Sequence, residues 1–168
     1  MEKGTLADER LKSDLAPGIV SGVAGIGTLV AILLFRDQVP VARGLSRIVG
    51  FSGLYAGMAL FLWGAAHLRG GIAGLVAPRL AGLVTAGPFR FVRHPTYLAM
   101  SVAMVGASIA TRSVVGLAVV ALVFLPAEIH RARLEERALR QRFGERWQEY
   151  ASEVGFFVPG VGKVPRHM

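Results

Sequence analysis

The residues best suited to chemistry lie in two short segments of the chain. The first segment, residues 87–98, reads GPFRFVRHPTYL and holds Arg90, Arg93 and His94 between two prolines. Pro95 restricts the residue before it to an extended backbone and favours the start of a helix. We expect a rigid polar corner at the mouth of an apolar helix, where polar groups need protein, water or a ligand as partners. The alternative is a basic flank that only anchors this helix.

The second segment holds Glu128, His130 and the adjacent pair Glu135 and Glu136. Adjacent helical residues point about 100° apart, so we expect only one carboxylate of the pair to face a given site squarely. Taken alone, the pair also fits a solvated helix, because Glu136 and Arg140 are four residues apart. Glu128 and His130 have no third His or Cys nearby, so we predict no metal site.

The sequence between these segments predicts that they meet. Residues 96–110 and 113–127 are two apolar runs separated by Thr111 and Arg112, a pattern typical of a transmembrane hairpin. Such a hairpin returns the acidic segment to the basic one and gathers basic, aromatic and acidic groups at one mouth. A zwitterion with an aromatic base would fit there. S-adenosylmethionine has a carboxylate for Arg or His, an ammonium for Glu and an adenine for apolar packing.

Composition indicates a membrane protein with one domain. The 168 residues are 53% hydrophobic, with a mean hydropathy of +0.51. Residues 17–35 and 48–67 carry no formal charge and are long enough to cross a bilayer. Pro17 is well placed to begin the first helix, and Gly53 and Gly57 predict close helix packing in the second. The chain has no cysteine, which excludes disulfides and thiolate chemistry.

We therefore expect an all-α polytopic membrane fold with about four transmembrane helices, in which a cytoplasmic C-terminal helix closes a cofactor pocket. Gly144 predicts a break within that last helical region. The single domain, residues 1–168, divides into an N-terminal segment (1–16), two spans (17–67), a loop (68–95), the hairpin (96–127) and a C-terminal segment (128–168).

The distribution of lysine and arginine predicts the orientation. With four spans, both termini and the 68–95 loop share one side, which holds 15 of the 19 basic residues. The other side holds Arg36, Arg43, Arg47 and Arg112. The heavier side is expected to be cytoplasmic, and the Arg-, Ala- and Gly-rich composition favours a bacterial inner membrane. We attribute the net charge of +8 to these flanks rather than to nucleic-acid binding, and expect the first apolar run to be retained rather than cleaved as a signal.

The ordered motifs resemble those of a known family. GPFRFVRHPTYLA, an apolar hairpin, the pair EE, FGERWQEY and a late FVP are similar to the pattern of the isoprenylcysteine carboxyl methyltransferase and phospholipid methyltransferase superfamily, over roughly residues 83 to 159. The resemblance implies an integral membrane methyltransferase with a cytoplasmic S-adenosylmethionine pocket. It also implies that the C-terminal segment covers the cofactor and that a lipophilic acceptor enters sideways from the bilayer.

By position, the resemblance assigns seven residues to the cofactor site: Arg93, His94, Pro95, Tyr97, Leu98, Glu135 and Glu136. Arg93 and His94 are also the candidate catalytic residues: Arg93 would hold a carboxylate acceptor, and His94 or His130 would help deprotonate an amine or thiol. Ala99 stands where the family usually has glycine. Glu153 stands where prenylcysteine enzymes tend to carry a basic residue, which argues against a prenylcysteine substrate.

Two other functions stay open at this point. One is a membrane reductase that uses NADPH on a sterol-like or enone lipid, because some such reductases resemble this family in their C-terminal halves. The other is a non-enzymatic membrane subunit or lipid-binding protein. The short chain and the Glu-Glu pair favour methyl transfer over the first, and the ordered RHPxY and EE motifs favour it over the second.

Overall fold

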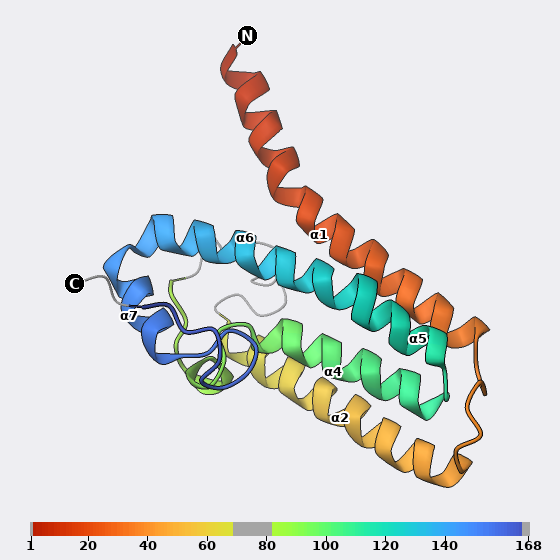
Figure 1. The fold of residues 1–168 in the computed structure, drawn as a ribbon. Helices are drawn as coiled ribbons and strands as arrows, with labels where there is room; N and C mark the ends of the chain where they lie inside the picture. The colour runs from red at the N-terminus through yellow and green to blue at the C-terminus, as the bar shows by residue number, and fades with distance from the viewer. Residues whose placement is uncertain (1, 69–81, 166–168) are drawn as a thin grey trace.

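The computed structural model describes residues 2–68 and 82–165, with side chains from residue 17 onward (Figure 1). These residues form helices and no β-strand, which confirms the all-α prediction for this part of the chain. The elements are α1 (Glu2–Leu34), α2 (Arg43–His67), the short 3-10 helix η2 (Gly87–Arg90), α4 (Pro95–Ala110), α5 (Val114–Val119), the π-helical turn η3 (Val120–Phe124), α6 (Leu125–Phe143) and α7 (Glu145–Glu153).

Among the described residues, three helical stretches are long and apolar enough to cross a membrane: Pro17–Leu34, Arg43–His67 and Val114–Phe143. The fourth apolar helix, α4, has 16 residues. At 1.5 Å per residue it is about 24 Å long, which is short for a full crossing. The polytopic membrane fold is thus confirmed, with one of the four predicted apolar helices shorter than the others.

Two helix boundaries differ from the sequence prediction. α1 begins at Glu2, so Pro17 lies inside a helix rather than at its start; the preceding residues are rich in Leu, Ala, Glu and Lys, which favour helix on that side too. The hairpin also does not end at residue 127, because α5, η3 and α6 follow one another without a break. The π-helical turn lies just before Pro126, whose missing N–H interrupts the regular hydrogen-bond pattern, and the helix continues beyond it.

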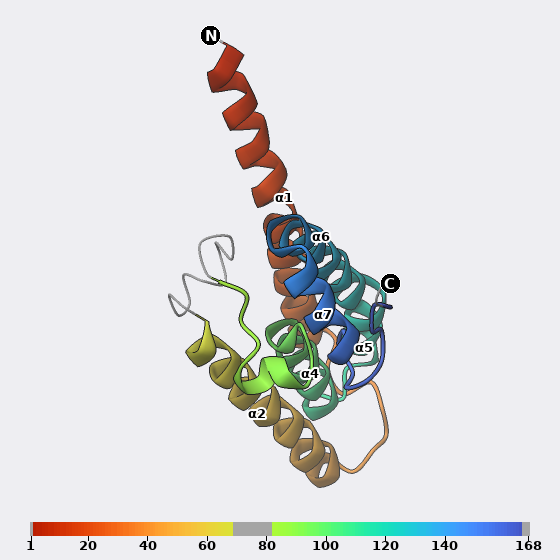
Figure 2. The ribbon, with the colours of Figure 1, turned by 90° about the vertical axis from the view of Figure 1, so that its left-hand side faces the viewer.

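Helices α2 and α4 run side by side in close contact (Figures 1 and 2). A Cβ atom placed on Gly57 would lie 2.6 Å from the Ala99 carbonyl oxygen, and one on Gly106 would lie 2.4 Å from the Leu54 nitrogen. A Cβ on Gly53 would lie 3.2 Å from the Cα of Gly106. The predicted packing role of the α2 glycines is therefore confirmed, because only residues without a side chain allow this approach.

Successive helices alternate in direction, so the connections gather at two ends of the bundle (Figure 1). At one end, residues 82–94 meet α6, α7 and residues 154–165, which are called the C-terminal segment from here on. At the other end, residues 35–42 meet the hairpin turn: the Asp37 amide donates to the Thr111 carbonyl at 3.0 Å, and the Gln38 amide donates to the Arg112 carbonyl at 3.0 Å. The two candidate segments of the sequence analysis both lie at the first end.

Candidate functional site

The segment before α4 forms the predicted polar corner. Gly87 has φ +61°, and a Cβ there would lie 2.5 Å from the His67 ring, so the turn requires glycine. The 3-10 turn Gly87–Arg90 follows at once. His94 is the N-cap residue of α4, with φ −125° and ψ 60°, and Pro95 is the first helical residue. The local sequence therefore fixes the backbone on which the basic residues stand.

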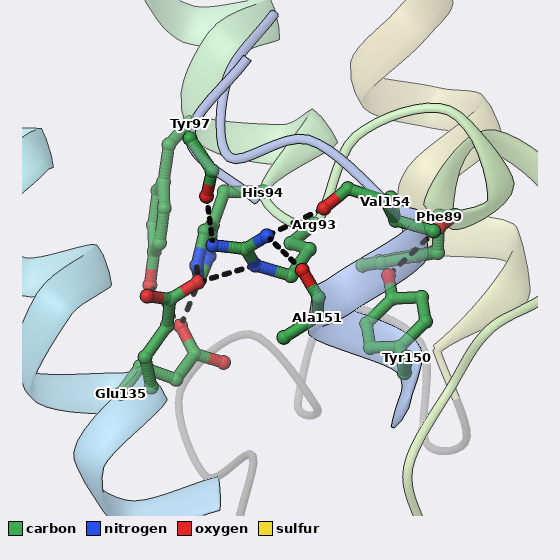
Figure 3. Close-up of polar contacts among 10 residues, drawn as sticks. Phe89, Arg93, His94, Tyr97, Glu135, Tyr150, Ala151 and Val154 are labelled. Atoms are coloured by element: carbon green, nitrogen blue, oxygen red, sulfur yellow. Dashed lines mark hydrogen bonds and ion pairs between the residues drawn. The ribbon is translucent and has the colours of Figure 1, made fainter. Parts of the chain in front are cut away.

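Arg93 is buried at the centre of this corner, with only 3% of its side chain exposed (Figure 3). Its Nε donates to Glu136 Oε1 at 2.6 Å. The remaining nitrogens donate to backbone carbonyls beyond α6, those of Ala151 at 3.2 Å, Val154, and Gly162 at 3.0 Å. Arg93 thus joins three parts of the chain: the corner, α6 and the C-terminal segment.

His94 lies between both glutamates of the predicted pair (Figure 3). Its Nε2 is 3.3 Å from Glu136 Oε1, and its Nδ1 is 3.9 Å from Glu135 Oε2. The Tyr97 hydroxyl donates to Glu135 Oε2 at 2.9 Å, and its ring stacks on that of His94 at 5.6 Å. The prediction that only one glutamate would face the site is therefore wrong. Glu136 bonds to the corner, and Glu135 bonds to Tyr97 in the first turn of α4. Two side chains that point about 100° apart therefore each have a partner at this site.

The C-terminal segment packs directly on His94. The Arg93 amide donates to the Gly155 carbonyl at 2.8 Å. The centroid of the Phe156 ring lies 5.0 Å from the centroid of the His94 ring, and that of Phe157 lies 6.1 Å from it. The two phenylalanines stack on each other at 4.7 Å. Residues 155–157 therefore close over the corner.

A cavity of about 50 Å³ lies between the corner, α6 and α7. Arg93, His94, Glu135 and Glu136 line it, together with three aromatic residues that were not among the predicted site residues: Phe89, Trp147 and Tyr150. Trp147 and Tyr150 are three residues apart in the FGERWQEY motif, so they lie on one face of α7. This spacing is the feature of the sequence that could have predicted them as site residues.

Trp147 is the most informative of these aromatic residues. It is only 4% exposed, and among the described residues its indole N–H has no hydrogen-bond partner. A buried donor without an acceptor is costly, and the side chain that carries it lines the cavity. The helix break at Gly144, where φ is +52°, was correctly predicted. Because α6 ends there, Trp147 lies on the separate helix α7.

Tyr150 supports the opposite wall of the cavity. Its hydroxyl donates to the Phe89 carbonyl at 2.7 Å (Figure 3). Burial raises the pKa of the Tyr150 phenol above its ordinary value, so the group stays protonated and keeps donating at neutral pH. This bond links α7 to η2.

The other predicted site residues lie on α4. Tyr97 reaches the site through Glu135. Pro95 and Leu98 are outside the cavity lining: Pro95 is buried at the helix start, and Leu98 is half-buried. Of the two residues proposed as alternative bases, His94 lines the cavity and His130 does not.

The known proteins that this chain is similar to are methyltransferases. The chain is 36% identical over 80 residues to protein-S-isoprenylcysteine O-methyltransferase A of Arabidopsis thaliana; the match covers 48% of this chain and 41% of that protein. The chain thus matches less than half of that relative's length. No solved structure gives a significant match. Residues 46–146, which include most of α2, the hairpin and both glutamates, match the model of the phospholipid methyltransferase family, and the chain therefore belongs to that family.

Proposed function

We propose that this chain is an integral membrane methyltransferase that uses S-adenosylmethionine at the cavity between the corner, α6 and α7. The observation that carries the proposal is the convergence of His94, two carboxylates and an unpartnered indole N–H at one small cavity. Family membership supports the same activity. We place the site on the cytoplasmic side of a bacterial inner membrane, because the 68–95 loop and residues 128–168 carry most of the basic residues.

The side chains around the cavity fit this cofactor by their chemistry. Glu135 and Glu136 are carboxylates of the kind that bind an ammonium group. Phe89, Trp147 and Tyr150 provide aromatic surfaces that suit both an adenine ring and a sulfonium cation. The unpartnered N–H of Trp147 offers a donor to a carboxylate or a ring nitrogen. No additional residue type is needed to recognise each part of the cofactor.

Binding requires the cavity to expand. Its volume of about 50 Å³ is well below the roughly 300 Å³ at which ligand pockets begin. We propose that the C-terminal segment moves to make room. It is held on the corner by the hydrogen bonds of Arg93 to its backbone carbonyls and by the packing of Phe156 and Phe157 on His94, and these contacts can break without unfolding a helix. Such a segment can close over a bound ligand and exclude water.

When bound, S-adenosylmethionine would supply a methyl group on its sulfonium. The lone pair of the acceptor would bond to the methyl carbon as the carbon–sulfur bond breaks, and the sulfur would leave as a neutral thioether. The protein positions the acceptor and keeps the site dry. His94 is within hydrogen-bonding distance of Glu136, so it is placed to take a proton from an amine or thiol acceptor. Four of the five N–H donors of Arg93 are already used by Glu136 and three carbonyls. We therefore assign Arg93 as a positioning residue that holds Glu136 and the covering segment, rather than as the group that holds an acceptor carboxylate.

Calorimetric titration of the detergent-purified chain with S-adenosylmethionine tests this proposal. We expect saturable binding that weakens at least about tenfold in a Glu135→Gln, Glu136→Gln variant, because it removes two charged partners of the ammonium. The matched control is Glu145→Gln, Glu149→Gln, which makes the same charge change at exposed positions of α7 and should bind normally.

A second variant separates binding from folding. Trp147→Phe keeps an aromatic ring in the wall but removes the unpartnered N–H, so its affinity should fall about fivefold, the equivalent of one hydrogen bond of about 1 kcal/mol. The thermal midpoint should stay close to that of the parent, since this N–H bonds to no described residue. Folded parent protein that binds NADPH but not S-adenosylmethionine would contradict the proposal.

A further inference from the structure

A second and larger cavity lies at the opposite end of the bundle. Its volume is about 520 Å³. Its walls come from the end of α1, the start of α2 and the end of α4, next to the connection formed by residues 35–42. It is remote from every residue of the proposed cofactor site, because the two cavities lie at opposite ends of α4.

The rim of this cavity is strongly basic. It carries four arginines and one acidic residue: Arg36, Arg43, Arg47, Arg112 and Asp37. Arg112 is occupied by the fold, because it contacts the Asp37 carboxylate and donates to the Val41 carbonyl at 2.8 Å. The hydrogen bond from Arg112 lowers the pKa of Asp37, which therefore stays ionised. Arg43 also lies 3.9 Å from the Asp37 carboxylate. Four arginines against one carboxylate still leave the rim with an excess of positive charge.

In the proposed orientation this end faces away from the cytoplasm. Loops on the translocated side of a membrane are usually poor in Lys and Arg. The four arginines are the only basic residues of the two connections at this end and their flanks. They come from three separate parts of the chain, yet all of them line one cavity. Their convergence points to an anionic ligand.

The helical spacing continues the basic rim into an apolar wall. On α1 the lining residues are Leu29, Ile32 and Leu33, and Arg36 lies two residues beyond the end of the helix. On α2 the lining residues after Arg43 and Arg47 are Phe51 and Leu54, at intervals of four and three residues. Residues three or four apart lie on one helix face. Helix α2 therefore presents cations at its start and apolar side chains one and two turns deeper, and α1 presents apolar side chains next to Arg36.

We propose that this cavity binds one anionic phospholipid. Its phosphate would lie among Arg36, Arg43 and Arg47, and an acyl chain would follow the apolar faces of α1 and α2 into the bilayer. A free phosphate would use the arginines but would leave the apolar wall without a partner. A zwitterionic lipid would gain less from the excess positive charge. The inference does not depend on the proposed methyltransferase activity.

Native mass spectrometry of the full chain in an uncharged detergent tests the proposal. The probes are phosphatidylglycerol, phosphatidylcholine with the same acyl chains, and inorganic phosphate. We expect phosphatidylglycerol to bind at one molecule per chain, phosphatidylcholine to bind more weakly, and inorganic phosphate not to displace the lipid. An Arg43→Gln, Arg47→Gln variant should bind phosphatidylglycerol about thirtyfold more weakly, from the usual contribution of two arginines near an anionic lipid.

The matched control is Arg140→Gln, Arg146→Gln, which removes two exposed arginines from the other end of the molecule. It should bind phosphatidylglycerol like the parent. Both variants should keep the thermal midpoint and the S-adenosylmethionine affinity of the parent, which separates this test from that of the cofactor site. Equal binding of the two lipids, unchanged binding in the Arg43, Arg47 variant, or displacement by inorganic phosphate would each overturn the proposal.

Discussion

Replacing Arg93 with lysine tests whether this residue holds the C-terminal segment on the site. Lysine keeps the positive charge but carries a single ammonium instead of the planar guanidinium fork. Arg93 bonds to Glu136, to the Ala151 carbonyl in α7 and to the Val154 and Gly162 carbonyls of the C-terminal segment. The ammonium of a lysine can keep the ion pair with Glu136 but cannot reach all three carbonyls.

The magnitude follows from the bonds that are lost. At about 1 to 1.5 kcal/mol for each bond, losing two or three of them weakens the attachment of the segment by about 2 to 4 kcal/mol. Because 1.4 kcal/mol is a factor of ten in an equilibrium constant, local opening becomes about 30- to 1,000-fold more frequent. The effect should be confined to this segment, since the helices pack through other contacts.

Hydrogen exchange measured by mass spectrometry reports this opening. The informative amides are those of Phe156, Val161 and Val164, which donate to carbonyls within the segment or in α7 at 2.8 to 3.0 Å. The control is Arg90→Lys, the same change at an exposed position of the same corner. If Arg93→Lys leaves exchange in this segment equal to that of the control, the positioning role assigned to Arg93 is wrong.

Two further predictions concern packing and protonation. Gly106→Ala should destabilise the protein by about 1 to 3 kcal/mol, because the new Cβ would lie 2.4 Å from the Leu54 nitrogen. Gly22→Ala, with nothing within 4 Å of the new Cβ, should be neutral or slightly stabilising in the same thermal-unfolding assay in detergent. Tyr150→Phe should cost about 1 kcal/mol by removing the bond to the Phe89 carbonyl. Because burial raises the pKa of Tyr150, its stabilising effect is complete below the ordinary tyrosine pKa of about 10 and declines as pH rises above it, so Tyr150→Phe should lessen the loss of stability at alkaline pH.

The features that the sequence predicted correctly depend on local signals. Pro95 begins α4, Thr111 and Arg112 form the turn of the hairpin, and Gly144 ends α6. Each residue acts through its own backbone preference or through the contrast between a polar turn and apolar neighbours. The same local reasoning failed at Pro17, because the helix formers that precede it let α1 begin at Glu2 and continue through the proline.

The sequence by itself determined the apolar helices, the polar corner before α4 and the motif order that marks the family, because these are properties of neighbouring residues. Only the tertiary structure decided that both glutamates reach one corner, that Arg93 holds the C-terminal segment, and that Trp147 faces the cavity. These contacts join residues about 40 to 70 positions apart. No periodicity within one segment fixes the rotation of α6 and α7 against α4, since that rotation depends on side chains that meet only after folding.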